Sequence, residues 1–172
     1  FWAGALSYDL VQLTQPIQLQ HPPHEGELLC VLWEIERCIV FDKEHEQLTV
    51  LSVDHDWKQN VDACMKEEVE ANPISELIQC QPPLSNSTDE EHEEIVRNVQ
   101  SSITDGQLYQ LNFGRSWEGE IKSEPWDVFC HSVSSNPAPY SGFLHMKDEE
   151  FALVSASPES LLSTQRGIIT TA

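Results

Sequence analysis

The sequence predicts an α+β fold, because hairpin patterns and amphipathic-helix patterns alternate along the chain. Two pairs of strand-like runs, rich in β-branched and aromatic residues, flank short polar turns within residues 28–53 and 141–156. Segments with helical spacing of apolar residues lie between them, at residues 57–71 and 88–106. The elements are short and mixed in order, which is typical of antiparallel sheets with helices packed beside them.

Composition indicates a globular protein that acts on small molecules. Of the 172 residues, 40% are apolar and only 7 are Gly and 10 Pro, so a core can form. The 29 acidic and 9 basic residues give a formal charge of -20, which opposes binding to nucleic acid or to an anionic membrane. No apolar run approaches the ~18 residues that a membrane helix needs.

The five cysteines are odd in number and widely spaced, which favours a protein of the reducing cytoplasm. They form no Cys-x-x-Cys pair that would indicate a zinc site or redox chemistry. The first residues lack the basic lead-in of a signal peptide. Because the chain starts without Met and stops abruptly at Ala172, we expect an internal fragment. Truncation would leave strands without their partners, so we expect the isolated chain to aggregate or to fold only partly.

In the front half, residues 1–10 are apolar and small and predict a buried strand. Residues 28–40 and 47–53, on either side of a polar turn, predict a hairpin. Residues 57–71 predict a helix, which Asn72 and Pro73 end.

Residues 79–86 contain two adjacent prolines, which cannot join a regular hydrogen-bond ladder, and so predict a linker. We therefore divide the chain into residues 1–86 and 87–172, as two parts of one structural domain.

In the back half, Thr88 and Glu91 have the spacing of a capping box, and Gly106 ends the helix that they begin. From residue 107 to 117 aromatic and aliphatic residues alternate with polar ones, which predicts a strand with unlike faces. Pro125 predicts the first turn of a helix to about Ser134. Two hairpins should follow, at residues 141–156 and 161–171.

Three features could bear chemistry, and each has a plain structural alternative. Glu159 follows a strand on a turn fixed by proline, as suits a general acid, yet it is one of 29 acidic residues and could simply lie on a loop. The Gln110 amide could bind a ligand carboxylate or hydroxyl from the polar face of its strand, or could face solvent. Residues 136–140 form a stiff turn with an aromatic side chain, which is more often structural than ligand-binding.

Common catalytic motifs are absent. The seven histidines are dispersed, without His-x-x-x-His or His-Glu-x-x-His spacing, which disfavours a metal site built from this chain alone. No Gly-rich phosphate loop, dinucleotide fingerprint or Gly-x-Ser-x-Gly elbow is present. The sequence therefore gives no support to nucleotide binding or serine hydrolysis.

Residues 103–112, 136–143 and 155–159, taken in this order and at this spacing, resemble the chorismate-binding enzymes, the component I subunits of aminodeoxychorismate synthase and anthranilate synthase. The front half is similar more weakly, through the Gly4–Asp9 segment. The resemblance implies a larger α+β fold, in which two antiparallel sheets pack on each other with helices outside. This chain would be a middle portion of that fold, truncated at both ends.

The resemblance also implies roles for single residues. Glu159 matches a glutamate that acts as general acid on the departing ring hydroxyl of chorismate, and burial would help such a group to stay protonated. Gln110 stands where relatives that add water have a lysine base, which implies an ammonia-using enzyme, since an amide cannot accept that proton. Pro139, Tyr140 and Ser141 match the lining of a tryptophan pocket, which is an effector site in anthranilate synthases and structural in many aminodeoxychorismate synthases.

The implied activity of the parent enzyme is amination of chorismate to 4-amino-4-deoxychorismate, in the route to p-aminobenzoate and folate. Ammonia would come from a glutamine amidotransferase partner, and Mg²⁺ would be held by glutamates beyond residue 172, so this chain alone should be inactive. The alternatives are formation of anthranilate for tryptophan synthesis, a non-catalytic homologue that keeps a tryptophan pocket, and an acidic interaction domain with chance motif matches.

Overall fold

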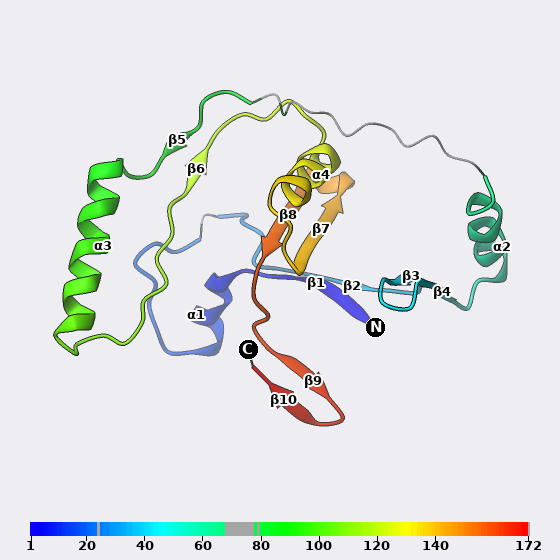
Figure 1. Ribbon diagram of the computed structural model, residues 1–172, viewed down its shortest axis with the longest axis horizontal. Coiled ribbons are helices and arrows are strands. Elements are labelled where there is room, and N and C mark those ends of the chain that lie inside the picture. The colour runs from blue at the N-terminus through cyan, green and yellow to red at the C-terminus, as the bar shows by residue number, and fades with distance from the viewer. Residues whose placement is uncertain (24, 68–77, 79, 172) are drawn as a thin grey trace. The chain divides into compact units, whose positions relative to one another are not determined.

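The computed structural model describes residues 1–23, 25–67, 78 and 80–171. They belong to two units, Phe1–Asn72 and Pro73–Ala172 (Figure 1). Helices and antiparallel strands are mixed along both units, as the sequence predicts for an α+β fold. The division at residue 86 stays a prediction.

The first unit opens with strand β1 (Trp2–Leu6), which pairs antiparallel with β2 (Cys30–Glu34). A Cβ atom on Gly4 would collide with the carbonyl oxygen of Val31, so only glycine permits this close pairing. The predicted strand at residues 1–10 is shorter than expected and is not buried, because every second residue is exposed. It gives way to a short 3₁₀ helix, η1 (Tyr8–Leu10), and a single helical turn, α1 (Val11–Thr14).

The predicted hairpin is confirmed as β3 (Arg37–Asp42) paired with β4 (Gln47–Ser52). Its first strand was predicted too long, because the chain turns at Ile35 and Glu36 and the preceding residues pair with β1 instead. Helix α2 (His55–Cys64) begins where the Asp54 carboxylate accepts a hydrogen bond from the Trp57 amide, at 3.0 Å. This helix ends earlier than predicted, and the expected stop at Asn72 and Pro73 lies outside the described residues.

The turn of this hairpin is held by Asp42. Its carboxylate accepts the amides of Glu44 and His45 at 3.0 and 3.1 Å and lies 2.9 Å from Nδ1 of the His45 ring. The side-chain bond to His45, followed by the backbone bond from the same residue, lowers the pKa of Asp42 below its usual value. The ionised carboxylate is therefore the form that holds the turn.

We expect His45→Ala to raise the pKa of Asp42 toward the usual value of an aspartate, as followed by carboxyl chemical shifts in an NMR titration. The pKa of Asp42 is lower in the folded than in the unfolded chain. The stability that its carboxylate gives to the folded turn is therefore present above the unfolded pKa, and it is lost as the pH falls through the folded pKa. His55→Ala, in α2, is the matched control and should leave Asp42 unchanged. An unaltered Asp42 midpoint in His45→Ala would refute the assignment.

In the second unit, β5 (Leu84–Ser85) pairs antiparallel with β6 (Trp117–Glu118). An isolated bridge between Cys80 and Ile121 extends this contact, and the backbone N–H of Gln81 donates to the backbone carbonyl of Glu120 at 3.1 Å. The prediction of a linker over residues 79–86 is therefore wrong for its described part. The two prolines fall between hydrogen-bonded residues, so their missing N–H groups do not break the contact.

Helix α3 (Asp89–Thr104) confirms the predicted capping box. The Thr88 hydroxyl accepts from the Glu91 amide at 3.2 Å, and the Thr88 amide donates to the Glu91 carboxylate at 2.8 Å. Gly106 follows the last turn with a φ of +73°. Glycine suits this left-handed conformation because it has no Cβ atom to clash with the backbone.

The strand predicted over residues 107–117 does not form. Residues 107–116 contain no strand, and only Trp117 and Glu118 pair, as β6. Residues 107 and 108 instead donate their backbone amides to the Ser102 carbonyl, in the turn that follows α3, and Ser116 is hydrogen-bonded to Asn86. A strand needs a paired strand beside it, and no strand of the described chain pairs with residues 107–116.

Helix α4 (Pro125–Ser135) confirms the prediction from Pro125 and packs against the hairpin of β7 (Tyr140–Met146) and β8 (Phe151–Ser157). The rings of Trp126, Phe129 and Phe143 join the helix to the hairpin, with centroids 5.3 to 5.6 Å apart. A 3₁₀ turn, η2 (Lys147–Glu149), connects β7 to β8. The final hairpin is confirmed, with shorter strands, as β9 (Ser163–Gln165) and β10 (Ile168–Thr170).

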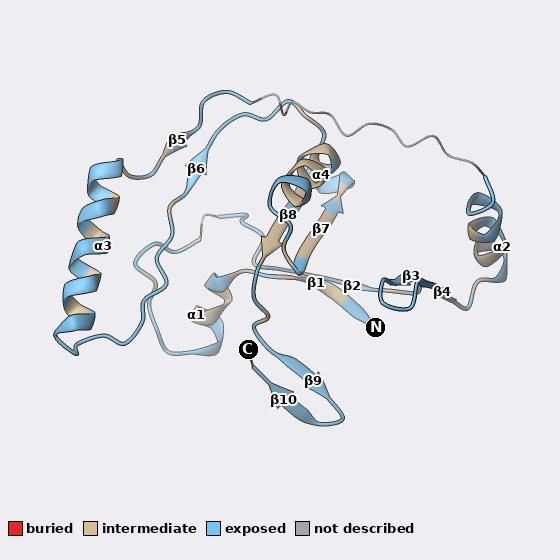
Figure 2. Cartoon of the chain, viewed as in Figure 1, coloured by how far each residue is buried: buried red, intermediate tan, exposed pale blue. Residues whose placement is uncertain are grey.

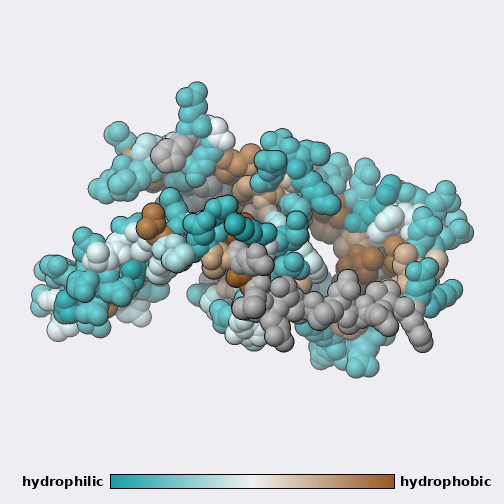
Figure 3. Space-filling view, turned by 90° about the horizontal axis from the view of Figure 1, so that it is seen from above, coloured by the Kyte–Doolittle hydropathy of each residue, from teal (hydrophilic) through white to brown (hydrophobic). Residues whose placement is uncertain are grey.

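None of the described residues is fully buried. Figure 2 shows the intermediate class gathered on α4, β7 and β8, and Figure 3 shows apolar residues open on the surface between hydrophilic ones. The described strands pair only two at a time, so the packed two-sheet arrangement that the resemblance implies is not seen among them. A two-stranded sheet is only marginally stable by itself and needs a helix or further strands packed on it.

None of the helices described is long and apolar enough to span a membrane.

Candidate functional site

A polar hollow of about 490 Å³ in the second unit brings together the two predicted catalytic residues. Gln110 lies on one side, on the extended connection between α3 and β6, and Glu159 lies on the turn that follows β8. Asn112, Ser157 and Ser160 complete its polar lining. Sequence reasoning did not propose these three, although Asn112 shares the polar face of Gln110 and Ser157 adjoins the Pro158–Glu159 pair.

The extended connection presents two unlike faces, as its alternating pattern predicts. Leu111 and Phe113 line a separate hollow of about 240 Å³ together with the apolar face of α3, and the Phe113 ring stacks on His92 at a centroid distance of 5.3 Å. Gln110 and Asn112, at the positions between and before them, line the polar hollow instead. Packing of the apolar residues against α3 therefore determines where the two amides lie.

The turn that bears Glu159 is held by its own residues. Ser157 is the last residue of β8, and its hydroxyl donates to the main-chain oxygen of Glu159 at 3.0 Å. Pro158 lies between them and restricts φ. Among the described residues, none forms a hydrogen bond or ion pair with the Glu159 carboxylate, which is exposed. The expectation that burial surrounds this carboxyl is therefore not met within the described chain.

The predicted tryptophan-pocket residues lie at the start of β7, next to the Glu159 turn. Tyr140 pairs with Ser157, and Ser141 pairs with Ala156. The Ser141 hydroxyl donates to the carbonyl of Ala138 at 2.8 Å, while Pro139 and Tyr140 are exposed. These residues do not line the polar hollow. The structure thus places them on the strand beside it without making them part of it.

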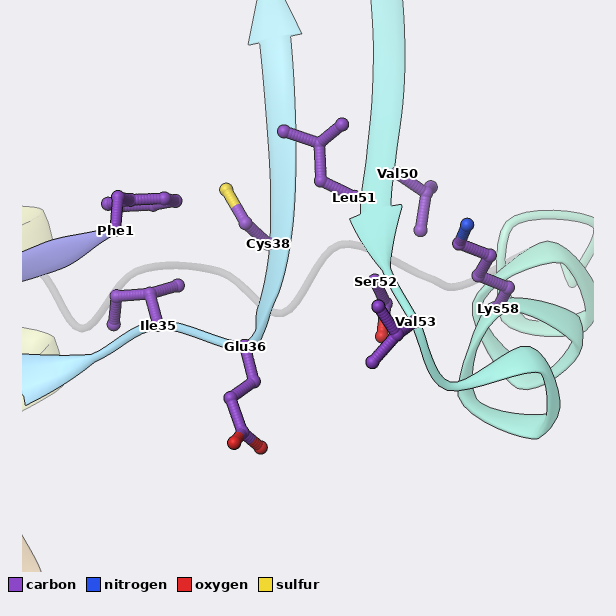
Figure 4. A pocket seen from close by; sticks show the side chains of 9 residues that line it. All are labelled: Phe1, Ile35, Glu36, Cys38, Val50, Leu51, Ser52, Val53 and Lys58. Atoms are coloured by element: carbon purple, nitrogen blue, oxygen red, sulfur yellow. The ribbon is translucent and has the colours of Figure 1, made fainter.

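The largely apolar hollow of the first unit, about 350 Å³ in volume, offers less chemistry. Phe1, Ile35, Cys38 and Leu51 are among the residues that line it, and the Glu36 carboxylate points away from these side chains (Figure 4). Its polar groups do not converge on one point, as a binding site for a small polar ligand would require.

The described residues include no set of ligands for the magnesium ion that the resemblance implies. Within the described residues, no group of three or more His, Cys, Asp or Glu side chains is placed to hold a metal. Of the described residues that line the polar hollow, Glu159 alone has a carboxylate, and the other polar groups are amides and hydroxyls. No step of a reaction at this hollow is therefore derived through a metal.

Comparison with known proteins gives consistent results. The profile of the family described as chorismate binding enzyme matches residues 1–172. Anthranilate synthase component 1 of Buchnera aphidicola subsp. Diuraphis noxia is 28% identical over 94% of this chain and 33% of its own length. Aminodeoxychorismate synthase component 1 of Escherichia coli is 28% identical over 69% of this chain and 26% of its own length.

The structural comparison agrees on the fold. A solved structure of anthranilate synthase component I from Streptococcus pneumoniae has a TM-score of 0.69 and 23% identity, and the match covers 99% of this chain and 41% of that one. The chain thus spans between a quarter and a third of the length of the curated relatives named above, and less than half of the solved one.

Proposed function

Because the chain belongs to the chorismate binding enzyme family, we propose that it forms part of a component I subunit that aminates chorismate at the polar hollow. The observation that supports this proposal is the meeting of Gln110 and Glu159, which are distant in sequence, in one hollow. The product we propose is 4-amino-4-deoxychorismate, with ammonia supplied by a glutamine amidotransferase in the cytoplasm. The complete fold would pack two antiparallel sheets, of which the described hairpins are pieces.

The proposed reaction replaces a ring hydroxyl by an amino group. Glu159 donates its proton to the departing hydroxyl, the ring C–O bond breaks, and the oxygen leaves as water. Ammonia forms the new C–N bond, and the proton that its nitrogen then loses restores the glutamic acid, so the step is balanced in atoms and charge. Such general acid catalysis contributes about 10² to 10⁴ in rate.

The amides of Gln110 and Asn112 suit the substrate because they can donate hydrogen bonds to it. Chorismate has two carboxylates and a ring hydroxyl, and an amide N–H can donate to any of them. An amide also cannot take a proton from water, which supports an ammonia-using enzyme over a water-adding one. Among the described residues, no lysine or arginine lines this hollow. We propose that Mg²⁺, bound by residues outside the described ones, balances the charge of the substrate.

The test is to express the full gene and incubate the purified protein with chorismate, Mg²⁺ and ammonium, with the product identified by mass. We expect a product of the mass of aminodeoxychorismate. The mass of anthranilate would move the assignment to the second reaction, which relatives of both kinds at equal identity leave open. A folded protein that binds tryptophan but consumes no chorismate would instead establish a non-catalytic homologue.

The same assay on residues 1–172 alone tests the proposal that this portion is inactive by itself. We propose that it is, because its hollow is open and the carboxylate within it is exposed. Turnover by the isolated portion would contradict this.

A further inference from the structure

We propose that Ser157 is a positioning residue that sets the Glu159 carboxyl in the polar hollow; this inference rests on the proposed function. Glu159 needs a fixed place to protonate a departing group, because small displacements of a catalytic group can cost about 10²-fold in rate. Yet among the described residues nothing holds its carboxylate directly. The position of the Glu159 carboxyl must therefore be set through the main chain of the turn.

The main chain of Ser157 is fixed from the strand side. Ser157 is the end of β8, and it stands opposite Tyr140 in a ladder that runs without interruption from Met146↔Phe151 to Tyr140↔Ser157. Helix α4 packs on this hairpin through Phe143. Ser157 is thus the last residue with a paired neighbour before the turn.

The side chain of Ser157 then fixes the first residues of the turn. Its hydroxyl donates to the main-chain oxygen of Glu159 at 3.0 Å, across Pro158, whose restricted φ limits the shapes that the turn can take. Together the ladder, the proline and this hydrogen bond connect the carboxyl to the hairpin. Of the three, only the hydrogen bond can be removed without changing the backbone.

Ser157 also lines the hollow, so a direct contact with substrate is the competing explanation. The two explanations differ in what they change. Loss of a substrate contact weakens binding, whereas loss of a positioning bond lowers kcat at nearly constant affinity and has no effect once the acid itself is gone. The hydroxyl of Ser134, which donates to the Cys130 carbonyl at 2.7 Å in α4, offers a chemically matched bond away from the hollow.

The experiment compares Ser157→Ala, Ser157→Thr and Ser134→Ala in the full-length protein. We expect Ser157→Ala to lower kcat about 10- to 100-fold with KM and the Kd of chorismate nearly unchanged, Ser157→Thr to restore most of the rate, and Ser134→Ala to match the unmodified enzyme. Adding Ser157→Ala to Glu159→Gln should cost nothing further. A rise in KM without a fall in kcat, or additive losses in the double variant, would overturn the inference.

Crystal structures of the unmodified protein and of Ser157→Ala give a second readout that does not need turnover. We expect the Glu159 carboxyl to leave its place in the variant while β7 and β8 keep their register. An unmoved carboxyl would overturn the inference whatever the assay shows. Failure of the unmodified, folded enzyme to consume chorismate would refute the proposed function alone, and the crystallographic comparison would still decide the role of Ser157.

Discussion

Replacing Glu159 with Gln should lower kcat/KM for chorismate about 10² to 10⁴-fold in the full-length enzyme while leaving the Kd of chorismate within a small factor. Glutamine keeps the size and the hydrogen-bonding capacity of the side chain but has no proton to give to the departing hydroxyl. Steady-state rates with ammonium, together with equilibrium binding of chorismate, measure the two quantities separately.

The matched control is Glu149→Gln, which makes the same substitution in the 3₁₀ turn η2 at the other end of the same hairpin. Because Glu149 does not line the hollow, its variant should keep the full rate. If Glu159→Gln weakened chorismate binding with kcat intact, the carboxyl would be a binding group. If it altered neither quantity, the polar hollow would not be the site of reaction.

Local features of the sequence predicted the local structure well. The capping box at Thr88 and Glu91, the helix start at Pro125 and the hairpin predicted over residues 141–156 all depend on nearby residues, and all were confirmed. The capping box and the helix start are formed within one turn, and the two strands of the hairpin follow each other in sequence, so one sequence is enough to recognise them.

The failures concern partners that are distant in sequence. Residues 107–117 were predicted as a strand, but only Trp117 belongs to one, because strand formation depends on a neighbouring strand that the pattern does not reveal. The opposite error occurred at Leu84 and Ser85, where two preceding prolines suggested a linker although these two residues pair with β6. In both cases the sequence did not reveal which distant residues pair with one another.

The same limit applies to the hollow. Alternation placed Gln110 and Asn112 on one face, and the Pro158 turn singled out Glu159, but nothing in either segment says that the two lie together. Only the resemblance brought Gln110 and Glu159 into one site. Asn112 and Ser157 were missed because, taken singly, an amide in an extended segment and a serine at the end of a strand are common.

Replacing Arg115 with Ala should produce the largest loss of stability in the second unit. The Arg115 side chain is 14% exposed and donates to the Asp89 carboxylate at 2.8 Å, to the Ser85 hydroxyl at 3.1 Å and to the Ser87 carbonyl at 2.7 Å. Its guanidinium also lies 4.9 Å from the centre of the Trp117 ring. One side chain thereby connects the start of α3 to both strands of the β5–β6 pair.

We expect a loss of about 2 kcal/mol, because two hydrogen bonds from a charged donor to partly buried groups and one cation–π contact disappear together. The Asp89 partner is 83% exposed, so that ion pair contributes little of this, and Asp89→Ala should cost under about 1 kcal/mol. Hydrogen exchange of the Asn86 amide, which donates to the Ser116 carbonyl at 3.0 Å, measures the loss locally. It should exchange about 30-fold faster in Arg115→Ala, since 1.4 kcal/mol corresponds to tenfold.

Arg97→Ala is the matched control, because Arg97 also pairs with a carboxylate on α3 but is 65% exposed, with its Glu93 partner 68% exposed. An exposed pair of this kind contributes about 0.5 kcal/mol or less, so Asn86 exchange should hardly change. Arg115→Lys should fall between, since a single ammonium cannot reach the serine and carbonyl groups and the carboxylate with the geometry of a guanidinium. Equal effects of Arg115→Ala and Arg97→Ala would mean that charge alone, rather than the partly buried connection between α3 and β5–β6, accounts for the stability.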